Sequence, residues 1–181
     1  MRRSGWILGI LGLFLPVMAL ADSNAAVEVV LNPAGSFRGE TKKVTGFAYK
    51  TSDGGVAAEN VQVDLRSLAT GIGLRDTHTK KRLETGKYPY AKLIKATGKG
   101  GVGKALVEIK GIKREVTGTY KIVGNELQAE FPMQLKDLKI TDVNYMGVGV
   151  ENEVKLHVNI PIKEKGRLPA SQGSAKKHNA K

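Results

Sequence analysis

Apolar and polar residues alternate along several segments of this chain. In segment 126–135 every second residue from Leu127 onward is apolar, and segment 154–162 shows the same pattern from Val154. Shorter stretches with this alternation occur at 61–65, 107–110 and 116–122. A period of two predicts β-strands that bury one face. Burial on one face only favours antiparallel over parallel pairing.

Glycine-rich turns separate these strands at short intervals. They occur at 52–55, 98–103, 111 and 124–125. About eight strands are predicted, with no helix long enough to cover a flat sheet. We therefore expect an all-β fold, in which the sheet closes into a single antiparallel β-barrel.

One segment, 67–84, lacks the alternation. Leu74, His78 and Leu83 share one side of a helical projection, and Gly86 follows as a stop signal. The segment predicts a loop and short helix, from about 70 to 84, inserted between two barrel strands.

The N-terminus has the layout of a secretory signal peptide over residues 1–21. Arg2 and Arg3 precede an apolar run, and Ala19-Leu20-Ala21 supplies small residues for cleavage. A membrane anchor is the alternative, but the run is short for a span of about 20 residues. We expect a periplasmic or secreted protein, whose folded domain covers 22–162. Because the chain has no cysteine, disulfides and thiolate metal sites are excluded.

Positive charge is concentrated in the predicted tail, 163–181. The chain carries a formal charge of +12, and the tail's six basic residues and one acidic residue contribute +5 of it. The composition of the tail predicts disorder. It is either a solvated end or a source of loose attraction to anionic lipid headgroups and surface polymers.

Residues 98–105 nearly match a nucleotide-binding loop, but the match fails chemically. Ala105 stands where a hydroxyl must bind Mg²⁺, and the following residues alternate like a strand instead of opening a helix. The expected structure is a basic hairpin loop.

Other chemistry is poorly supported by the sequence. His78, His157 and His178 lack metal-ligand spacing. Asp76 and His78 could form an acid–base pair, but a capping or orienting role is favoured over catalysis. Nucleic-acid binding lacks an aromatic stacking platform. We therefore predict a protein that is not an enzyme, and that holds no metal.

A set of motifs resembles the YceI-like family of bacterial lipid-binding proteins. The main one, at 68–78, is Leu-x-Thr-Gly-x-x-x-Arg-Asp-x-His, and Lys-Tyr-Pro follows at 87–89. Further pieces in the same order lie at 44–47, 109–117 and 135–147. Together they span about 27–162. One departure is at 32–36, where Asn-Pro-Ala-Gly-Ser replaces the family's D-x-x-H-S stretch.

This resemblance implies a lipocalin-like barrel that encloses an isoprenoid chain or a similar amphiphile, with no catalytic residues. The expected function is binding, storage or transport of a polyisoprenoid, quinone or fatty-acyl-like ligand, with no other cofactor. The alternative is an adhesion module for anionic surfaces that uses the tail and loops. Oligomeric state is left open, with a dimer as one alternative.

The predicted ligand contacts combine the helix region with inward-facing strand positions. Arg75, Asp76 and His78 are expected near a polar headgroup, or else in an internal structural network. Small residues on the inward side, Gly118 and Ala129, favour an open interior. The full predicted set is Phe47, Leu74, Arg75, Asp76, His78, Tyr88, Tyr120, Phe131, Met133 and Met146.

Overall fold

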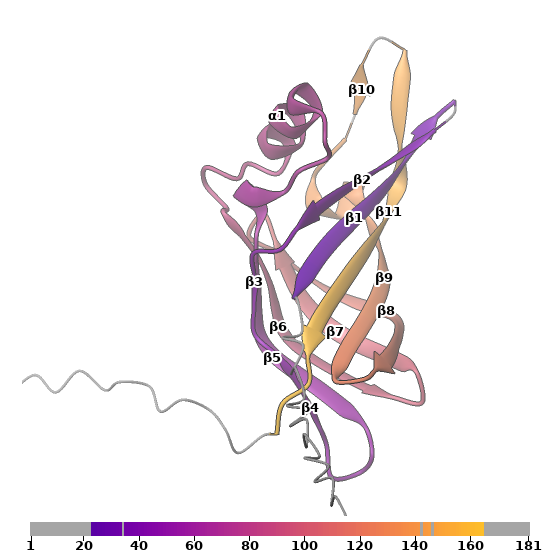
Figure 1. Cartoon of the computed structure of the whole chain (residues 1–181). Coiled ribbons are helices and arrows are strands. Elements are labelled where there is room, and N and C mark those ends of the chain that lie inside the picture. The colour runs from indigo at the N-terminus through magenta and orange to yellow at the C-terminus, as the bar shows by residue number, and fades with distance from the viewer. Residues whose placement is uncertain (1–22, 34, 142, 146, 165–181) are drawn as a thin grey trace, which may run out of the picture.

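Eight strands of six or more residues form the wall of a barrel in the computed structural model (Figure 1). They are β1 (Asn24–Asn32), β2 (Ser36–Thr41), β5 (Val56–Asp64), β6 (Tyr90–Lys99), β7 (Val102–Ile109), β8 (Ile112–Val123), β9 (Glu126–Gln134) and β11 (Val148–Pro161). Three shorter strands are β3 (Val44–Thr45), β4 (Ala48–Lys50) and β10 (Asn144–Tyr145). The helical elements are η1 (Leu65–Ser67), α1 (Gly73–Arg82) and η2 (Leu135–Leu138).

The structure describes residues 23–33, 35–141, 143–145 and 147–164. The predicted signal peptide, nearly all of the predicted tail and Met146 lie outside the described residues. Among the described residues, no helix is long and apolar enough to span a membrane.

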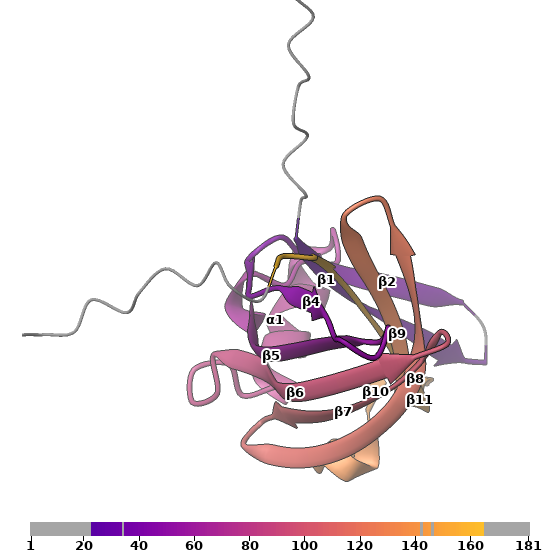
Figure 2. The ribbon, with the colours of Figure 1, turned by 90° about the horizontal axis from the view of Figure 1, so that it is seen from below.

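The strands pair in the order β2-β1-β11-β9-β8-β7-β6-β5-β3, and every strand-to-strand pairing is antiparallel. Two contacts link β2 and the end of β11 to the β4–β5 side of the sheet. Glu40 and Ala69 exchange backbone hydrogen bonds of 2.8 and 2.9 Å, and Lys163 donates its backbone N–H to the carbonyl of Ala48 at 2.8 Å. Seen from below, the sheet curls round on itself (Figure 2). The predicted antiparallel barrel is confirmed.

The alternating segments place their apolar side chains inside the barrel, as predicted. Phe131 and Met133 of β9 and Val154 and Ile160 of β11 are all buried. Two of the predicted runs end differently. Leu65 and Leu135 leave their strands and begin the 3₁₀ turns η1 and η2.

The segment that resembled a phosphate-binding loop is a two-residue hairpin between β6 and β7. Gly100 and Gly101 have φ values of 63° and 85°, while Lys99 and Val102 pair on either side. Positive φ at both central residues is the requirement of a type I′ turn, which suits the twist of antiparallel strands. The hairpin expectation is therefore confirmed, and no helix follows these glycines to hold a phosphate.

The predicted helix is present as α1, shorter than expected at both ends. It lies at one end of the barrel, opposite the β4–β5 turn (Figure 1). None of its residues is buried, and Leu74 is 58% exposed. Leu83, just after the helix, packs against the barrel core. The shared apolar side predicted for Leu74 and Leu83 is therefore wrong, because only Leu83 faces inward.

Candidate ligand-binding cavities

The barrel interior contains a cavity at the end nearest α1, here called the α1-end cavity. Its volume is about 130 Å³. The strands supply apolar side chains such as Val61, Met133 and Val154, and the turns close it with Leu68, Leu83 and Leu138. These side chains offer a ligand apolar contacts and no charged or strong hydrogen-bonding groups. The cavity therefore suits a hydrocarbon and no ionic ligand.

Three polar residues border the α1-end cavity. The Nζ of Lys92 lies 3.5 Å from Glu108. The ring of His157 lies 3.5 Å from Glu130 and 3.6 Å from Glu28, and its buried Nε2 makes no hydrogen bond within the described part of the chain. Thr41 hydrogen-bonds through its hydroxyl to Ser67 at 2.6 Å. The cavity wall thus offers a ligand little polar surface.

A second cavity, here called the hairpin-end cavity, lies toward the β6–β7 and β8–β9 hairpins. Its volume is about 70 Å³, and Ala58, Ala105, Leu127 and Ile160 contribute to its walls. Tyr120 also lines it. The Tyr120 ring lies so close to Gly98 that a Cβ there would come within 2.5 Å of the ring. An aromatic side chain thus covers a glycine of the neighbouring hairpin.

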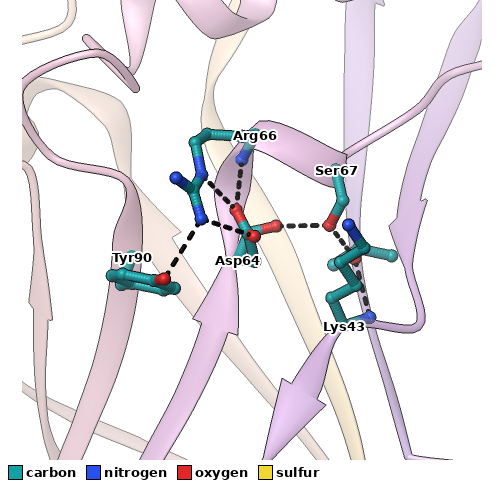
Figure 3. Close-up of polar contacts among 6 residues, drawn as sticks. Lys43, Asp64, Arg66, Ser67 and Tyr90 are labelled. Atoms are coloured by element: carbon teal, nitrogen blue, oxygen red, sulfur yellow. Dashed lines mark hydrogen bonds and ion pairs between the residues drawn. The ribbon is translucent and has the colours of Figure 1, made fainter.

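A polar cluster fixes the turn that supplies part of the α1-end cavity (Figure 3). The Asp64 carboxylate accepts hydrogen bonds from the backbone N–H of Arg66 at 3.0 Å and from its guanidinium Nε and Nη2 at 2.9 Å. Arg66 also donates to the hydroxyl of Tyr90 at 3.1 Å. Asp64 therefore caps η1, which positions Leu65 and Leu68 at the cavity.

The same cluster makes folding stability depend on pH. Hydrogen bonds from the Arg66 side chain hold the pKa of Asp64 below its ordinary value of 3.8. This contribution to stability is complete above the unfolded-state pKa and is lost as pH falls through the lower folded-state pKa.

Asp64→Asn can still cap η1. We expect its free energy of unfolding to decrease less than that of the wild type as the pH falls. The difference in free energy of unfolding between the two proteins should be constant above about pH 5 and should narrow below it. Urea unfolding from pH 7 to pH 2 measures this. A difference that does not change with pH would show that the ionised carboxylate adds nothing.

The sequence motif at 68–78 makes local contacts at the barrel end. Asp76 accepts hydrogen bonds from the backbone N–H and the hydroxyl of Thr70, both at 2.6 Å, and these bonds lower the pKa of Asp76. The guanidinium of Arg75 lies 4.5 Å from the centre of the Phe37 ring. These contacts tie α1 to the preceding loop and to β2. Arg75 and Asp76 thus make structural contacts of the kind that the sequence left as an alternative to headgroup binding.

The predicted ligand contacts are divided between the barrel interior and its surface. Tyr120, Phe131 and Met133 line the cavities. Outside the walls of both cavities lie Phe47, Leu74, Arg75, Asp76, His78 and Tyr88. Contact of any of these residues with a ligand stays a prediction.

Sequence reasoning missed Leu93, which lines both cavities. Leu93 and Ala96 both line cavity walls although their spacing is odd, because the β6–β7 ladder shifts register between Leu93 and Lys95. On β5, the strand that pairs with β6, Asn60 also departs from regular strand geometry, with a left-handed φ of 54°. A β-bulge reverses the inward face of a strand, so strict alternation cannot locate such a position.

Among the described residues, no group of three histidine or acidic side chains is placed to hold a metal. His157 lies close to Glu28 and Glu130 without forming such a group. The functional candidate is therefore the apolar interior.

An eight-stranded antiparallel barrel of this kind has an interior wide enough for side chains or one small ligand. Comparison with known families assigns the chain more narrowly: a model of the YceI-like domain matches residues 19–162, and the chain belongs to this family.

Two solved structures share the fold. One is BcnA from Burkholderia cenocepacia, with 15% identity and a TM-score of 0.55, covering 75% of this chain and 94% of that one. The other is a polyisoprenoid-binding domain from Saccharophagus degradans implicated in plant cell wall breakdown. It has 13% identity and a TM-score of 0.53, covering 77% of this chain and 92% of that one. No curated protein sequence matches the chain significantly.

Proposed function

We propose that this protein binds a long apolar chain inside its barrel and carries or stores it after export to the periplasm. The observation that supports this most directly is the pair of cavities with almost wholly apolar walls. Membership of the YceI-like family and the polyisoprenoid-binding structural neighbour are consistent with a polyisoprenoid, quinone or fatty-acyl-like ligand.

The energetics favour a ligand recognised by its length. Each CH₂ group that leaves water contributes about 0.8 kcal/mol, so two CH₂ groups strengthen binding by roughly tenfold. Since the walls offer little polar surface, headgroup chemistry contributes little inside the barrel. Binding should therefore depend strongly on chain length and weakly on the headgroup.

Solvent extraction of the full chain, purified without detergent, should release such a lipid for identification by mass spectrometry. The delipidated protein should take up added isoprenoid quinones and long-chain fatty amides. Absence of both a co-purified lipid and any uptake would reject the proposed function.

Ala91→Phe provides a test by filling the cavity. Ala91 is a partly buried residue of β6 that lines the α1-end cavity. An aromatic ring there should weaken uptake at least about tenfold, because it occupies the space of several CH₂ groups. Thr117→Phe is the matched control, since Thr117 is exposed on β8. Equal uptake by the two variants, with both folded by circular dichroism, would count against binding in this cavity.

The adhesion alternative depends mainly on the basic tail, which lies almost wholly outside the described residues. Deletion of 166–181 separates the two functions. Retained lipid uptake by the truncated chain supports the carrier, and loss of surface attachment without any lipid uptake supports adhesion.

A further inference from the structure

The two cavities share three wall residues, and these mark the level at which the cavities adjoin. Leu93, Phe131 and Val158 are the only residues common to both walls in the described part of the chain. Apart from these three, the two cavities have separate linings, one toward α1 and one toward the hairpins. The interior is thus a series of two chambers.

The three side chains come from different parts of the barrel wall. Phe131 of β9 and Val158 of β11 are diagonal neighbours, because Phe131 pairs with Leu156 and Val158 pairs with Ala129. Leu93 belongs to β6, which lies three strands from β9 and four from β11 in the pairing order. It therefore reaches the same level from across the barrel.

The packing of these residues fits a partition. Phe131 is 8% exposed and belongs to the core cluster that surrounds the α1-end cavity. Leu93 packs against the other cluster, which contains Ile160 and Leu127. Val158 packs against both clusters. The apolar core is thus divided at the level where the cavities meet.

The cavity sizes make this partition important for the ligand. At about 130 Å³, the α1-end cavity is comparable with an engineered apolar cavity of about 150 Å³ that holds one benzene molecule. A long chain exceeds that space. It must continue into the hairpin-end cavity, past the level of the three shared side chains.

We infer that Leu93, Phe131 and Val158 form a partition that sets the length of apolar chain the barrel accepts. Short chains occupy the α1-end cavity and leave the partition in place. Longer chains displace its side chains and place their apolar end in the hairpin-end cavity. This inference rests on the proposed function, and it assigns chain-length specificity to three residues.

The test uses straight-chain primary alcohols from hexanol to octadecanol as probes, with binding to the delipidated full chain measured by calorimetry. In the wild type, affinity should rise with each added CH₂ group and then stop rising, or rise less, at one length. That break marks the chain whose end meets the partition. Phe131→Ala should remove the break, and affinity for the longest alcohols should increase at least about tenfold relative to hexanol.

Two further variants keep the inference falsifiable if Phe131→Ala does not fold. Leu93→Ala opens the partition from the other side and should also remove the break or move it to longer alcohols. Val158→Phe enlarges the partition and should weaken binding of the longest alcohols at least about tenfold, with hexanol binding nearly unchanged. Thermal unfolding checks that each variant is folded.

Met133→Ala is the matched control, because Met133 is a buried β9 residue that lines only the α1-end cavity. It enlarges that cavity, but the break should stay at the same alcohol length. At most, it should move by the number of CH₂ groups that fit in the space of the removed side chain. No binding of any alcohol by the wild type would reject the proposed function itself. Binding with no break, or a break that the folded partition variants leave unchanged, would overturn the partition alone.

Discussion

Gly118→Ala is expected to destabilise the protein by about 3 kcal/mol or more, because the added methyl group has no space. A Cβ at Gly118 would lie 2.2 Å from the carbonyl oxygen of Glu130 and 2.6 Å from the Cβ of Phe131. The carbonyl belongs to backbone, so no side-chain rotation can relieve the overlap. β8 and β9 would have to separate where their pairing ends, at Thr119 and Glu130.

Urea unfolding measures this cost, and the melting temperature should fall by roughly 6–12 °C. Gly73→Ala is the control, because a Cβ at that first residue of α1 meets nothing within 4 Å. Alanine also has a higher helix propensity than glycine. Gly73→Ala should leave stability unchanged or raise it. Similar stability of Gly118→Ala and the wild type would mean that β8 and β9 are not in such close contact.

Ile160→Ala is the second large effect, with an expected loss of about 2–4 kcal/mol. Ile160 is 2% exposed and packs with Ala48, Val61 and Leu127 in the core near the hairpins. Its removal costs the transfer free energy of the lost methyl and methylene groups, and it leaves an enlarged cavity.

Ile122→Ala provides the same chemical change at the barrel surface, where Ile122 is 43% exposed. Its expected cost is about 0.5 kcal/mol. Because Ile160 lines the hairpin-end cavity, a long apolar ligand should restore part of the stability lost in Ile160→Ala. A free ligand concentration of 100 times the dissociation constant adds about 2.7 kcal/mol to the free energy of unfolding. Equal costs for the two substitutions would contradict the packing described for Ile160.

Gly118 also shows a packing constraint that the sequence pattern does not contain. Its inward position and small size suggest an open interior. In the structure Gly118 does line the hairpin-end cavity, but the volume that a side chain there would occupy is taken by the backbone of β9. Ala129 also borders the hairpin-end cavity. From the sequence the two positions look alike, because the approach of a neighbouring strand is not encoded in local residue order.

The site was only partly predictable for a related reason. Tyr120, Phe131 and Met133 were found because they follow the alternation of their strands, and all three line cavities. Leu74 was included through helical periodicity, which gives the direction of a side chain around a helix but not which side meets the barrel. Leu93 was missed because a register shift interrupts the alternation of β6.

The sequence by itself located β5, β7, β8, β9 and β11 through their alternation, and it predicted antiparallel pairing, hairpins at glycine-rich turns and closure into a barrel. These features follow from local physics: a period of two for burial on one face, and positive φ at particular glycines. Tertiary structure alone decided that Glu40 meets Ala69, that Tyr120 covers Gly98, and that Leu93, Phe131 and Val158 divide the interior. Each of these depends on which side chains meet across the closed barrel, and that is set by register and bulges rather than by the order of residues along one strand.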